Sequence, residues 1–428
     1  MLERQLTTDA KGHFLNTNQC FSADGKWLVY DTRNDDSKIG STGSIEMVNV
    51  LTGEIKLLYQ TKNQTEYGPG VGAASFSPAT NRVVFIHGIR NANEKNPYGF
   101  TRRTGVAIDV DNPEVPIFMD ARDVKPPFIP GALRGGTHAH SWSGDGQWLS
   151  FTYNDDVIAQ LSKINQKVQD LRTVGVMFPG KVNVAEEANG ENNSAEMFAV
   201  VVTKVTENPT PGSDDIDKAF DECWIGNRGY QKADGSRQER AIAFQGNVKD
   251  EHGDSKTEIF VVDLPTDLSI AKLGEALAGT VTRRPDVPAG IKQRRITFTK
   301  EGVLGPRHWL RSSPDGTQIA FLSKDTFGFI NAFVVSPNGG LVKQISFNSF
   351  DIQSGLNFSP NGRYISYVAQ NAIYITELAT GESKQLIESS AQEDRPVSAV
   401  IWSPDGKTLA YNRYVKNDGS YLQIFLLK

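Results

Sequence analysis

Trp402-Ser403-Pro404-Asp405-Gly406, followed by KTLAYNRY at 407–414, is the stretch of sequence that decides the fold. Asp-Gly supplies the positive φ angles of a tight hairpin turn, and the alternating apolar residues after it are typical of a strand. The pattern has five further copies: Phe21-Ser-Ala-Asp-Gly, Phe76-Ser-Pro-Ala-Thr, Trp142-Ser-Gly-Asp-Gly, Ser312-Ser-Pro-Asp-Gly and Phe358-Ser-Pro-Asn-Gly. A hairpin that recurs along a whole chain indicates a repeat architecture.

Each hairpin is followed by a third apolar stretch such as SIEMVNV or AIYITEL, and several by a fourth such as EIKLLYQ or SKQLIES. Four antiparallel strands per repeat make the blade of a β-propeller. The gap of 170 residues between the anchors at 142 and 312 must hold a further blade, with RAIAFQGN and KTEIFVVDLP as its middle strands. We therefore predict one all-β, seven-bladed β-propeller domain over 1–428. Eight blades and an open row of β-sandwiches are the alternatives.

Two segments around this repeat pattern carry further predictions. The last repeat stops one strand short, and LERQLTTD near the N-terminus reads like the missing strand, so residues Leu2 to Thr8 are expected to close the ring. Residues around 184–238 are expected to form an insertion in or before blade four. Within it, SDDIDKAFDECW at 213–224 reads as a helix capped by Asp214 and Asp215, or as a lid whose carboxylates face the channel.

Composition limits the classes of function. The formal charge of −5 argues against a nucleic-acid partner. The two cysteines, Cys20 and Cys223, cannot form a disulfide framework or a cysteine-rich zinc site. The sequence has no signal-like start and no apolar run long enough to span a bilayer, so we expect a cytoplasmic protein without a membrane partner. It also has no GxSxG elbow, Walker loop or dinucleotide fingerprint, which argues against a serine hydrolase.

Histidines gather before two of the anchors, at the rim where propellers bind ligands. His138 and His140 are separated by one residue, so on a regular strand they point the same way. His308 stands seven residues before Asp315, as His138 stands seven before Asp145. These three histidines could hold a divalent metal such as Mn or Zn, because neutral imidazole suits these ions. The alternative is that they are hydrogen-bonded structural residues.

Arginines accompany the same rim, and arginine forks pair with carboxylates. We predict that Arg33, Arg90 and Arg103 hold the carboxylates of an acidic sugar or another small ligand as catalytic residues. A substrate-binding role is predicted for His13, His87, Arg134 and Arg307. The alternative for these residues is a solvated polar loop.

The anchors followed by IAFLSKD or TLAYNRY resemble TolB-like and WD40-like propeller repeats over nearly the whole chain. Blade one, HFLNTNQCFSADGKWLVYDTR, resembles the opening of oligogalacturonate lyases, and the whole chain is similar to an enterobacterial propeller family of unassigned function. The lyase resemblance implies a cytoplasmic seven-bladed propeller. It also implies metal-assisted β-elimination of unsaturated uronate oligomers, with manganese held by histidines and a glutamine.

The lyase pattern carries over only in part. His308 stands where the lyase offers a histidine ligand in its fifth blade. The His-x-His pair of the lyase's final blade is absent from Arg395-Pro-Val-Ser-Ala-Val-Ile-Trp402, whereas the His138–His140 pair lies in blade three with Gly135 in place of the glutamine. Two hypotheses follow: a metal-dependent lyase acting on acidic oligosaccharides, and a non-catalytic propeller whose rim binds a protein or a small ligand.

Overall fold

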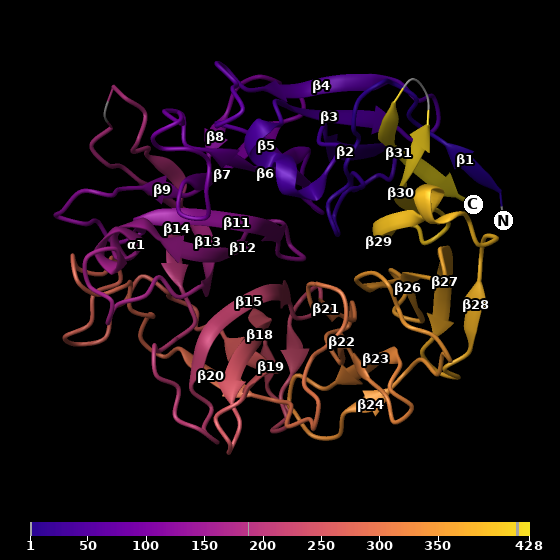
Figure 1. Cartoon of the computed structure of the whole chain (residues 1–428). Coiled ribbons are helices and arrows are strands. Elements are labelled where there is room, and N and C mark those ends of the chain that lie inside the picture. The colour runs from indigo at the N-terminus through magenta and orange to yellow at the C-terminus, as the bar shows by residue number, and fades with distance from the viewer. Residues whose placement is uncertain (1, 187, 417–418) are drawn as a thin grey trace.

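The computed structural model describes residues 2–186, 188–416 and 419–428. Over these residues the main sheets form seven blades around one axis, as Figure 1 shows. The prediction of an all-β, seven-bladed propeller is confirmed, with seven blades rather than eight. The segments RAIAFQGN and KTEIFVVDLP supply the two middle strands of blade four, as predicted.

The strands of each blade follow one another from the channel outward. Blades one to three comprise β2 (Trp27–Asp31), β3 (Ser44–Asn49), β4 (Ile55–Gln60); β5 (Val71–Phe76), β6 (Arg82–Gly88), β7 (Arg103–Asp109), β8 (Ile117–Phe118); and β11 (Gly135–Trp142), β12 (Leu149–Asp155), β13 (Thr173–Val182), β14 (Ala195–Val201). In blade one, isolated bridges from Phe14 to Asp31 and from Phe21 to Leu28 take the place of a regular innermost strand.

The remaining four blades repeat this order. They comprise β15 (Ile216–Trp224), β18 (Ala241–Lys249), β19 (Ser255–Asp263), β20 (Lys292–Arg295); β21 (Arg311–Ser312), β22 (Ile319–Lys324), β23 (Ile330–Val335), β24 (Lys343–Gln344); β25 (Asn357–Phe358), β26 (Tyr364–Ala369), β27 (Ala372–Glu377), β28 (Ser383–Gln385); and β29 (Pro396–Trp402), β30 (Leu409–Lys416), β31 (Ser420–Leu427), β1 (Glu3–Gln5).

Short elements occupy the connections between these strands. They are the helix α1 (Asp156–Ser162), the 3-10 helices η1 (Asp36–Ser41) and η2 (Gln392–Asp394), the parallel pair β9 (Ala121–Arg122) and β10 (Ala132–Leu133), and the hairpin of β16 (Tyr230–Gln231) and β17 (Arg237–Gln238). Among the described residues, none of the helices is both long and apolar enough to cross a membrane.

The recurring Ser-x-Asp-Gly sequence has a direct structural explanation. In blade three, the Ser143 hydroxyl donates to Asp145 at 2.6 Å and accepts from the backbone N–H of Trp148 at 3.0 Å. Gly146 has a φ of 67°, which glycine adopts without steric cost. The same serine-to-acid bond occurs between Ser403 and Asp405 at 2.6 Å. The side chains thus fix the turn and the register of each hairpin.

The N-terminal strand closes the ring, as predicted. Within the predicted segment, β1 pairs antiparallel with β31, with Glu3 opposite Leu427 and Gln5 opposite Phe425. Leu6 is buried in an apolar cluster that joins blade seven to blade one and includes Leu28 and Ile424. The labelled ends of the chain consequently lie side by side in Figure 1. Six similar apolar clusters fill the other blade interfaces.

The helix expected at 213–224 is wrong, because residues 216–224 form β15, the innermost strand of blade four. The register of β15 against β18 shifts between Ile216 and Lys218 and again between Phe220 and Cys223. These bulges interrupt the alternation of side chains between the two faces of the strand. The apolar residues therefore recur every three or four positions, as they do in a helix. The expected cap at Asp214 and Asp215 is absent for the same reason.

Two strands within the segment 184–238 belong to regular blades. FAVVVTKV contributes β14 to blade three, and β15 opens blade four. A longer connection, 264–291, lies between β19 and β20. It packs on blade four through Leu268 and Val287, which join the apolar cluster shared by blades three and four.

The closing strand gives a stability test. Leu6→Ala should lower the free energy of unfolding by about 2 kcal/mol, because it leaves a cavity between blades seven and one. Leu2→Ala is the matched control, since Leu2 is 76% exposed and should change this energy by less than about 0.5 kcal/mol. Urea denaturation measures both variants. Equal stability of the two would contradict the packing of this segment in solution.

Candidate functional site

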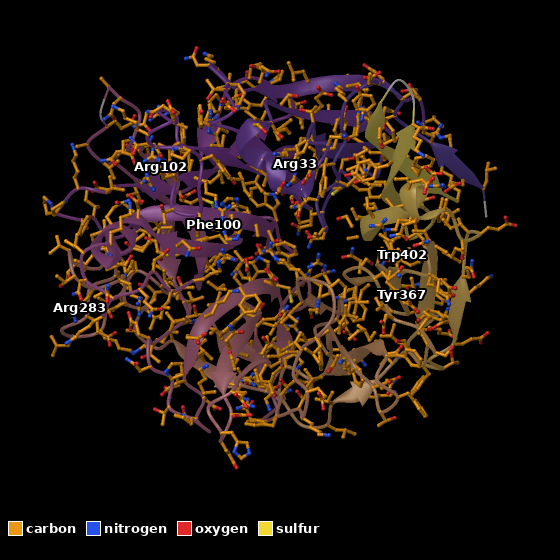
Figure 2. All side chains as sticks on the ribbon, viewed as in Figure 1. Arg33, Phe100, Arg102, Arg283, Tyr367 and Trp402 are labelled. Atoms are coloured by element: carbon orange, nitrogen blue, oxygen red, sulfur yellow. The ribbon has the colours of Figure 1, made fainter. Side chains whose placement is uncertain are left out.

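A cavity of about 720 Å³ lies on the axis of the ring, lined by residues from blades one, two, three, five, six and seven. Among its lining residues are Arg33, Asp36, Tyr98, Phe100, Arg103, His138, Arg172, Arg307, His308, Trp309, Arg311, Arg395 and Tyr414. In Figure 2, Arg33 and Phe100 lie beside the centre of the ring, with Tyr367 and Trp402 on the opposite side. This volume is in the range of small-molecule sites.

Bulges with strained backbone recur in the inner strands around the cavity. Ala73, Ala139, Asp221 and Ser398 have φ angles of 56°, 59°, 49° and 62°. Each residue lies at a register shift, in β5, β11, β15 and β29 respectively. A bulge inserts an extra residue and re-aims the neighbouring side chains. Non-glycine residues in this region cost energy and gather at functional sites.

The bulge at Ala139 separates two histidines that were predicted to point the same way. His138 lines the cavity, whereas His140 is fully buried outside its lining. His140 Nε2 bonds to the Thr137 hydroxyl at 3.0 Å, and that hydroxyl donates to Asp120 at 3.1 Å. The interpretation of His138 and His140 as a ligand pair on one face is therefore wrong.

His308 lines the cavity, but both of its ring nitrogens are occupied. Nδ1 donates to the Pro306 carbonyl at 2.9 Å, and Nε2 accepts from the backbone N–H of Leu322 at 3.2 Å. A nitrogen that accepts a hydrogen bond has no lone pair left for a metal. Within the described parts of the chain, no group of three His, Cys, Asp or Glu side chains is arranged to hold a metal ion. The predicted triad of His138, His140 and His308 does not fit manganese or zinc.

Two further histidines predicted to bind substrate lie outside the cavity. His87 bonds to the Tyr59 hydroxyl at 2.9 Å and to the Gly88 carbonyl, and burial lowers its pKa to about 4. His13 contacts the Leu422 carbonyl at 3.3 Å, and burial lowers its pKa to about 4 as well. Both are neutral histidines of blade interiors, which corrects their predicted role.

The predicted arginines divide into two groups. Arg33, Arg103 and Arg307 line the cavity. Arg90 is exposed outside the cavity lining and donates to the Asn192 carbonyl at 2.9 Å. Arg134 is fully buried and bonds to Asp155 at 2.7 Å and to the Arg283 carbonyl at 3.0 Å. Because Arg283 lies at the outer edge of the ring in Figure 2, Arg134 secures the 264–291 connection instead of a ligand.

Three more arginines, Arg172, Arg311 and Arg395, complete a set of six in the lining of the cavity. Sequence reasoning missed them. Arg311 follows the Arg307-His308-Trp309 run by two positions, which was the available signal. Arg395 opens blade seven, in the segment compared with the lyase. Arg172 follows the connection that carries α1, and the repeat pattern gives no signal there.

Positive charge is poorly compensated in this cavity. Arg33 pairs with Asp31 at 2.8 Å and Asp36 at 2.9 Å, and Arg307 pairs with Asp221 at 3.0 Å. Within the described residues, no carboxylate lies within 4.0 Å of the other four: Arg103, Arg172, Arg311 and Arg395. Arg311 instead donates to Asn357 and to backbone carbonyls, and burial lowers its pKa to about 10.

Arg103 stands out among these side chains because it is buried and has unpaired donors. It is only 4% exposed, and its Nη1 donates to the Tyr98 hydroxyl at 3.2 Å. Its Nε and Nη2 are enclosed and have no hydrogen-bond partner among the described residues. Phe100 lies against both Arg103 and Arg172, 5.0 and 5.1 Å from the two guanidinium carbons. A buried donor without an acceptor lowers the stability of the folded protein, so each such group in a native structure requires an explanation.

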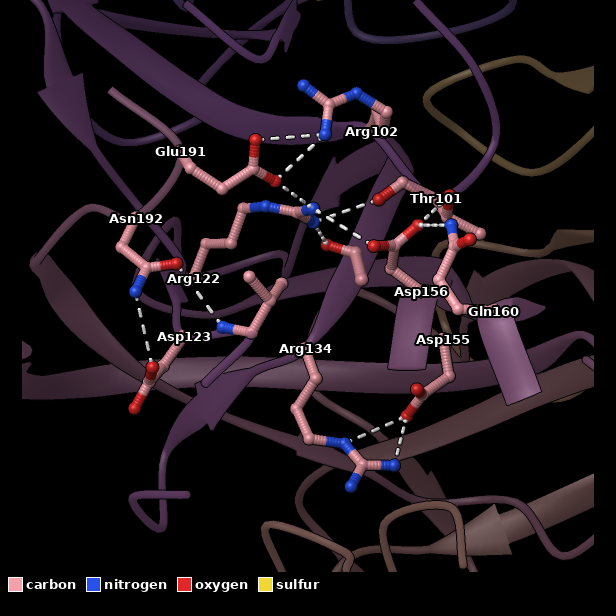
Figure 3. A network of polar contacts seen from close by, with 12 residues as sticks. Thr101, Arg102, Arg122, Asp123, Arg134, Asp155, Asp156, Gln160, Glu191 and Asn192 are labelled. Atoms are coloured by element: carbon pink, nitrogen blue, oxygen red, sulfur yellow. Dashed lines mark hydrogen bonds and ion pairs between the residues drawn. The ribbon is translucent and has the colours of Figure 1, made fainter. Parts of the chain in front are cut away.

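A buried ion-pair network fixes the loop that carries Tyr98 and Phe100 (Figure 3). Glu191 accepts from Arg102 at 2.9 Å and from Arg122 at 2.8 Å. Arg122 also donates to the carbonyl of Thr101 at 2.8 Å. Burial acts to raise the pKa of Glu191, but the charges of these arginines, with Arg122 first, lower it to about 2. The two residues that follow Phe100 are thus held in place.

Asp221 and Glu222, which were predicted either to belong to a helix or to face the channel from a lid, lie on β15. Asp221 holds Arg307 at the cavity. Glu222 is fully buried, with Oε2 accepting from the Thr152 hydroxyl at 2.9 Å. Its Oε1 is enclosed without a partner among the described residues. Burial raises the pKa of Glu222 to about 7.

A seven-bladed β-propeller with an arginine-rich cavity on its axis is the class of protein that fold and site define. The chain belongs to the family of the "Uncharacterized protein YidR" of Escherichia coli (strain K12). The two are 38% identical over 417 residues, which cover 95% of this chain and 94% of that protein. The resemblance to an enterobacterial propeller family is thereby confirmed.

Family comparisons match two segments of the chain. Residues 70–192 match the family described as "Protein of unknown function (DUF3748)". Residues 340–420 match the "Dipeptidyl peptidase IV (DPP IV) N-terminal region".

Two solved structures align with most of the chain. An oligogalacturonate lyase in complex with manganese aligns with a TM-score of 0.52 at 11% identity, covering 99% of this chain and 92% of that one. TolB from Acinetobacter baumannii aligns with a TM-score of 0.40 at 14% identity, covering 95% and 80%. The lyase likeness confirms the predicted fold resemblance. At 11% identity, the likeness to the lyase shows a shared fold and nothing more.

His308 gives the first test of the site. His308→Ala should lower the free energy of unfolding by about 2 kcal/mol, because the Leu322 N–H and the Pro306 carbonyl lose their partner. The loss should be the same with EDTA or with added manganese. His252→Ala, at an exposed turn, is the control. A destabilisation seen only when metal is present would identify His308 as a ligand and contradict this interpretation.

Glu222 gives a test that depends on pH. Its pKa rises from 4.5 to about 7 in the folded protein, so between these values the folded chain keeps a proton that the unfolded chain releases. The stabilisation from this group is complete below about pH 4.5 and is lost as the pH rises through about 7, by about 3 kcal/mol.

Glu222→Gln cannot ionise and should remove this part of the pH dependence. Urea denaturation of both proteins at about pH 5 and about pH 8 measures it, with the exposed Glu94→Gln as the control. An unchanged pH dependence in Glu222→Gln would show that the carboxyl has an ordinary pKa.

Proposed function

We propose that the protein binds an acidic, uronate-type oligosaccharide in the axial cavity and cleaves it by β-elimination. The observation that carries the proposal is the lining of the cavity, which has six arginines but one carboxylate, Asp36, among the described residues. An anionic ligand would compensate this charge. Charged groups in a site of low dielectric interact much more strongly than in water.

The free edge of Arg103 favours a carboxylate as the anionic group. Nε and Nη2 lie on one edge of the guanidinium and donate in parallel, which matches the two oxygens of a carboxylate. Arg307 uses this same edge for Asp221, with Nε–Oδ2 at 3.3 Å and Nη2–Oδ1 at 3.0 Å. In Arg103 the edge has no protein partner among the described residues. Both nitrogens are enclosed, so a ligand carboxylate would pair with this edge once the Arg103 side chain turns towards the cavity.

Aromatic side chains in the lining suit the sugar rings of such a ligand. Phe100 is 63% exposed, and Trp309 lies beneath Arg307 with 4.5 Å between the guanidinium carbon and the ring. Pockets for small molecules combine apolar and aromatic walls with a few polar groups that fix orientation. The cavity has this composition.

The same arginines support elimination chemistry. Removal of the proton next to a carboxylate places negative charge on that carboxylate, and preorganised donors stabilise such charge in the transition state. The oligogalacturonate lyase with the similar fold was solved with manganese. Because the predicted histidine triad does not fit a metal, we assign the charge stabilisation here to Arg103, Arg172 and Arg307.

Binding of a saturated digalacturonate, measured by titration calorimetry, tests the proposal. Arg103→Ala should weaken binding at least about 10-fold, because a bidentate charged contact is lost. Arg103→Lys should also weaken it, since lysine has no fork. Arg90→Ala, outside the cavity, is the matched control, and lactose is the neutral ligand control.

Product formation is followed by the ultraviolet absorbance of the conjugated double bond. Binding without such a rise would leave a non-catalytic propeller that holds an acidic ligand. Equal affinity for digalacturonate and lactose, or no loss in Arg103→Ala, would refute the proposed site.

A further inference from the structure

We propose that a second pocket, on the rim between blades one and seven, binds the carboxylate of a further uronate unit of the ligand held in the axial cavity. We call it the rim pocket. This inference rests on the proposed function, and it adds a subsite that sets the length of the oligosaccharide that the protein prefers. It is carried by the position of the pocket, its ordered wall and its free positive charges.

The rim pocket has a volume of about 590 Å³. It lies between the β2–β3 connection of blade one and the strands β30 and β31 of blade seven, which are neighbours in Figure 1. Hydroxyl and amide side chains can pair with the hydroxyl groups of a sugar. The lining residues that carry such groups are Thr32, Asn34, Ser41, Thr42, Tyr414 and Ser420.

The rim pocket adjoins the axial cavity. Arg33 and Tyr414 line both spaces, so they form part of the wall between them. The helix η1 continues this wall, with Ser37 in the lining of the cavity and Lys38 in the lining of the pocket. A chain of sugar units that crosses the wall therefore occupies both spaces.

Asn34 orders the rim pocket by joining blade one to blade seven. Its Nδ2 donates to the Ser420 carbonyl at 2.7 Å, and its Oδ1 accepts from the backbone N–H of Leu422 at 2.7 Å. The Tyr414 hydroxyl donates to the Asn34 carbonyl at 2.8 Å. A pocket whose wall is already ordered loses less conformational entropy when it binds a ligand.

Arg33 keeps one free donor although it is only 3% exposed. Its Nε donates to Asp31 at 2.8 Å, and its Nη1 donates to Asp36 at 2.9 Å. Its Nη2 has no hydrogen-bond partner among the described residues and is not one of the enclosed atoms. This nitrogen of a buried cation can therefore reach a ligand in the spaces that Arg33 lines.

Lys38 supplies a second cation. No carboxylate of the described residues lies within 4.0 Å of its Nζ. Asp35, the one carboxylate in the described lining of the rim pocket, accepts from the backbone N–H and the hydroxyl of Ser37, both at 2.8 Å. These two bonds come first in lowering the pKa of Asp35, ahead of the charge of Lys38.

The free donors of Arg33 and Lys38 identify the ligand group as an anion. Hydrogen bonds from charged donors to a carboxylate are about twice as strong as those between neutral groups. Each unit of a uronate oligomer carries a carboxylate, so a unit that extends out of the cavity brings this group into the rim pocket. A neutral sugar would leave both cations without a partner.

Ligand length gives the main test. In titration calorimetry the wild type should bind saturated trigalacturonate at least about 10-fold more tightly than digalacturonate, because the third unit adds charged contacts. Lys38→Ala should remove most of this difference and keep the affinity for digalacturonate within about 2-fold of the wild type. Lys407→Ala, at an exposed hairpin turn of blade seven, is the matched control.

Ser41→Trp tests the rim pocket by exclusion instead of by charge. Ser41 is exposed in η1 and lines the rim pocket, so an indole at this position should fill the space of the third unit. Affinity for trigalacturonate should fall to that for digalacturonate, which binds in the cavity and should be unaffected. Thr52→Trp, at an exposed turn outside both linings, is the control.

The outcomes separate this inference from the proposed function. Binding of digalacturonate and trigalacturonate with equal affinity by the wild type would overturn the rim pocket and leave the function standing. A preference for trigalacturonate that persists in both Lys38→Ala and Ser41→Trp would do the same. Failure of the wild type to bind either ligand would overturn the function and the rim pocket together. A preference that both variants lose, with unchanged binding of digalacturonate, would support the rim pocket.

Discussion

The hydrogen bonds between β1 and β31 are the constraint on which this molecule depends. They join residues from the two ends of the chain, Glu3 and Leu427, and so turn a row of blades into a ring. In a closed ring every blade packs against two neighbours, and an apolar cluster fills each interface between blades. Closure also removes an exposed strand edge. The axial cavity exists because six blades are held at fixed positions around it.

The cavity concentrates positive charge at an energetic cost to folding. Arg103 and Arg311 are 4% and 8% exposed and have no carboxylate partner among the described residues. Burial of an unpaired charge is unfavourable. The fold offsets part of this cost with aromatic rings, as for Arg103 above Phe100, and with carbonyl groups, as for Arg311. A site that retains such charges is organised for an anion before the anion arrives.

The sequence was informative about the repeat and its hairpins, and weak where a bulge interrupts a strand. The hairpins could be predicted because a turn such as Ser403 to Gly406 is fixed by its own residues. The closing strand could be predicted because a blade was one strand short. The strand β15 was misread as a helix, since its bulges disturb the alternation that marks a strand.

The site was predicted in part. Arg33, Arg103, Arg307 and His138 lie in the cavity, because their places relative to the anchors put them at one rim. The prediction that His138, His140 and His308 hold a metal was wrong for two reasons that the sequence does not show. A bulge at Ala139 separates His138 from His140, and backbone groups from Pro306 and Leu322 occupy His308. Arg172 was missed because it enters the cavity from an irregular connection.

The strained residues Ala73, Ala139, Asp221 and Ser398 have a consequence for how this ring can diversify. Each belongs to a different blade and sets the direction of side chains at its own rim position, while the packing between blades relies on other residues. A change at one bulge can therefore alter one wall of the cavity and leave the ring intact. Relatives can therefore change their ligand preference through substitutions in one blade at a time, while each variant still folds.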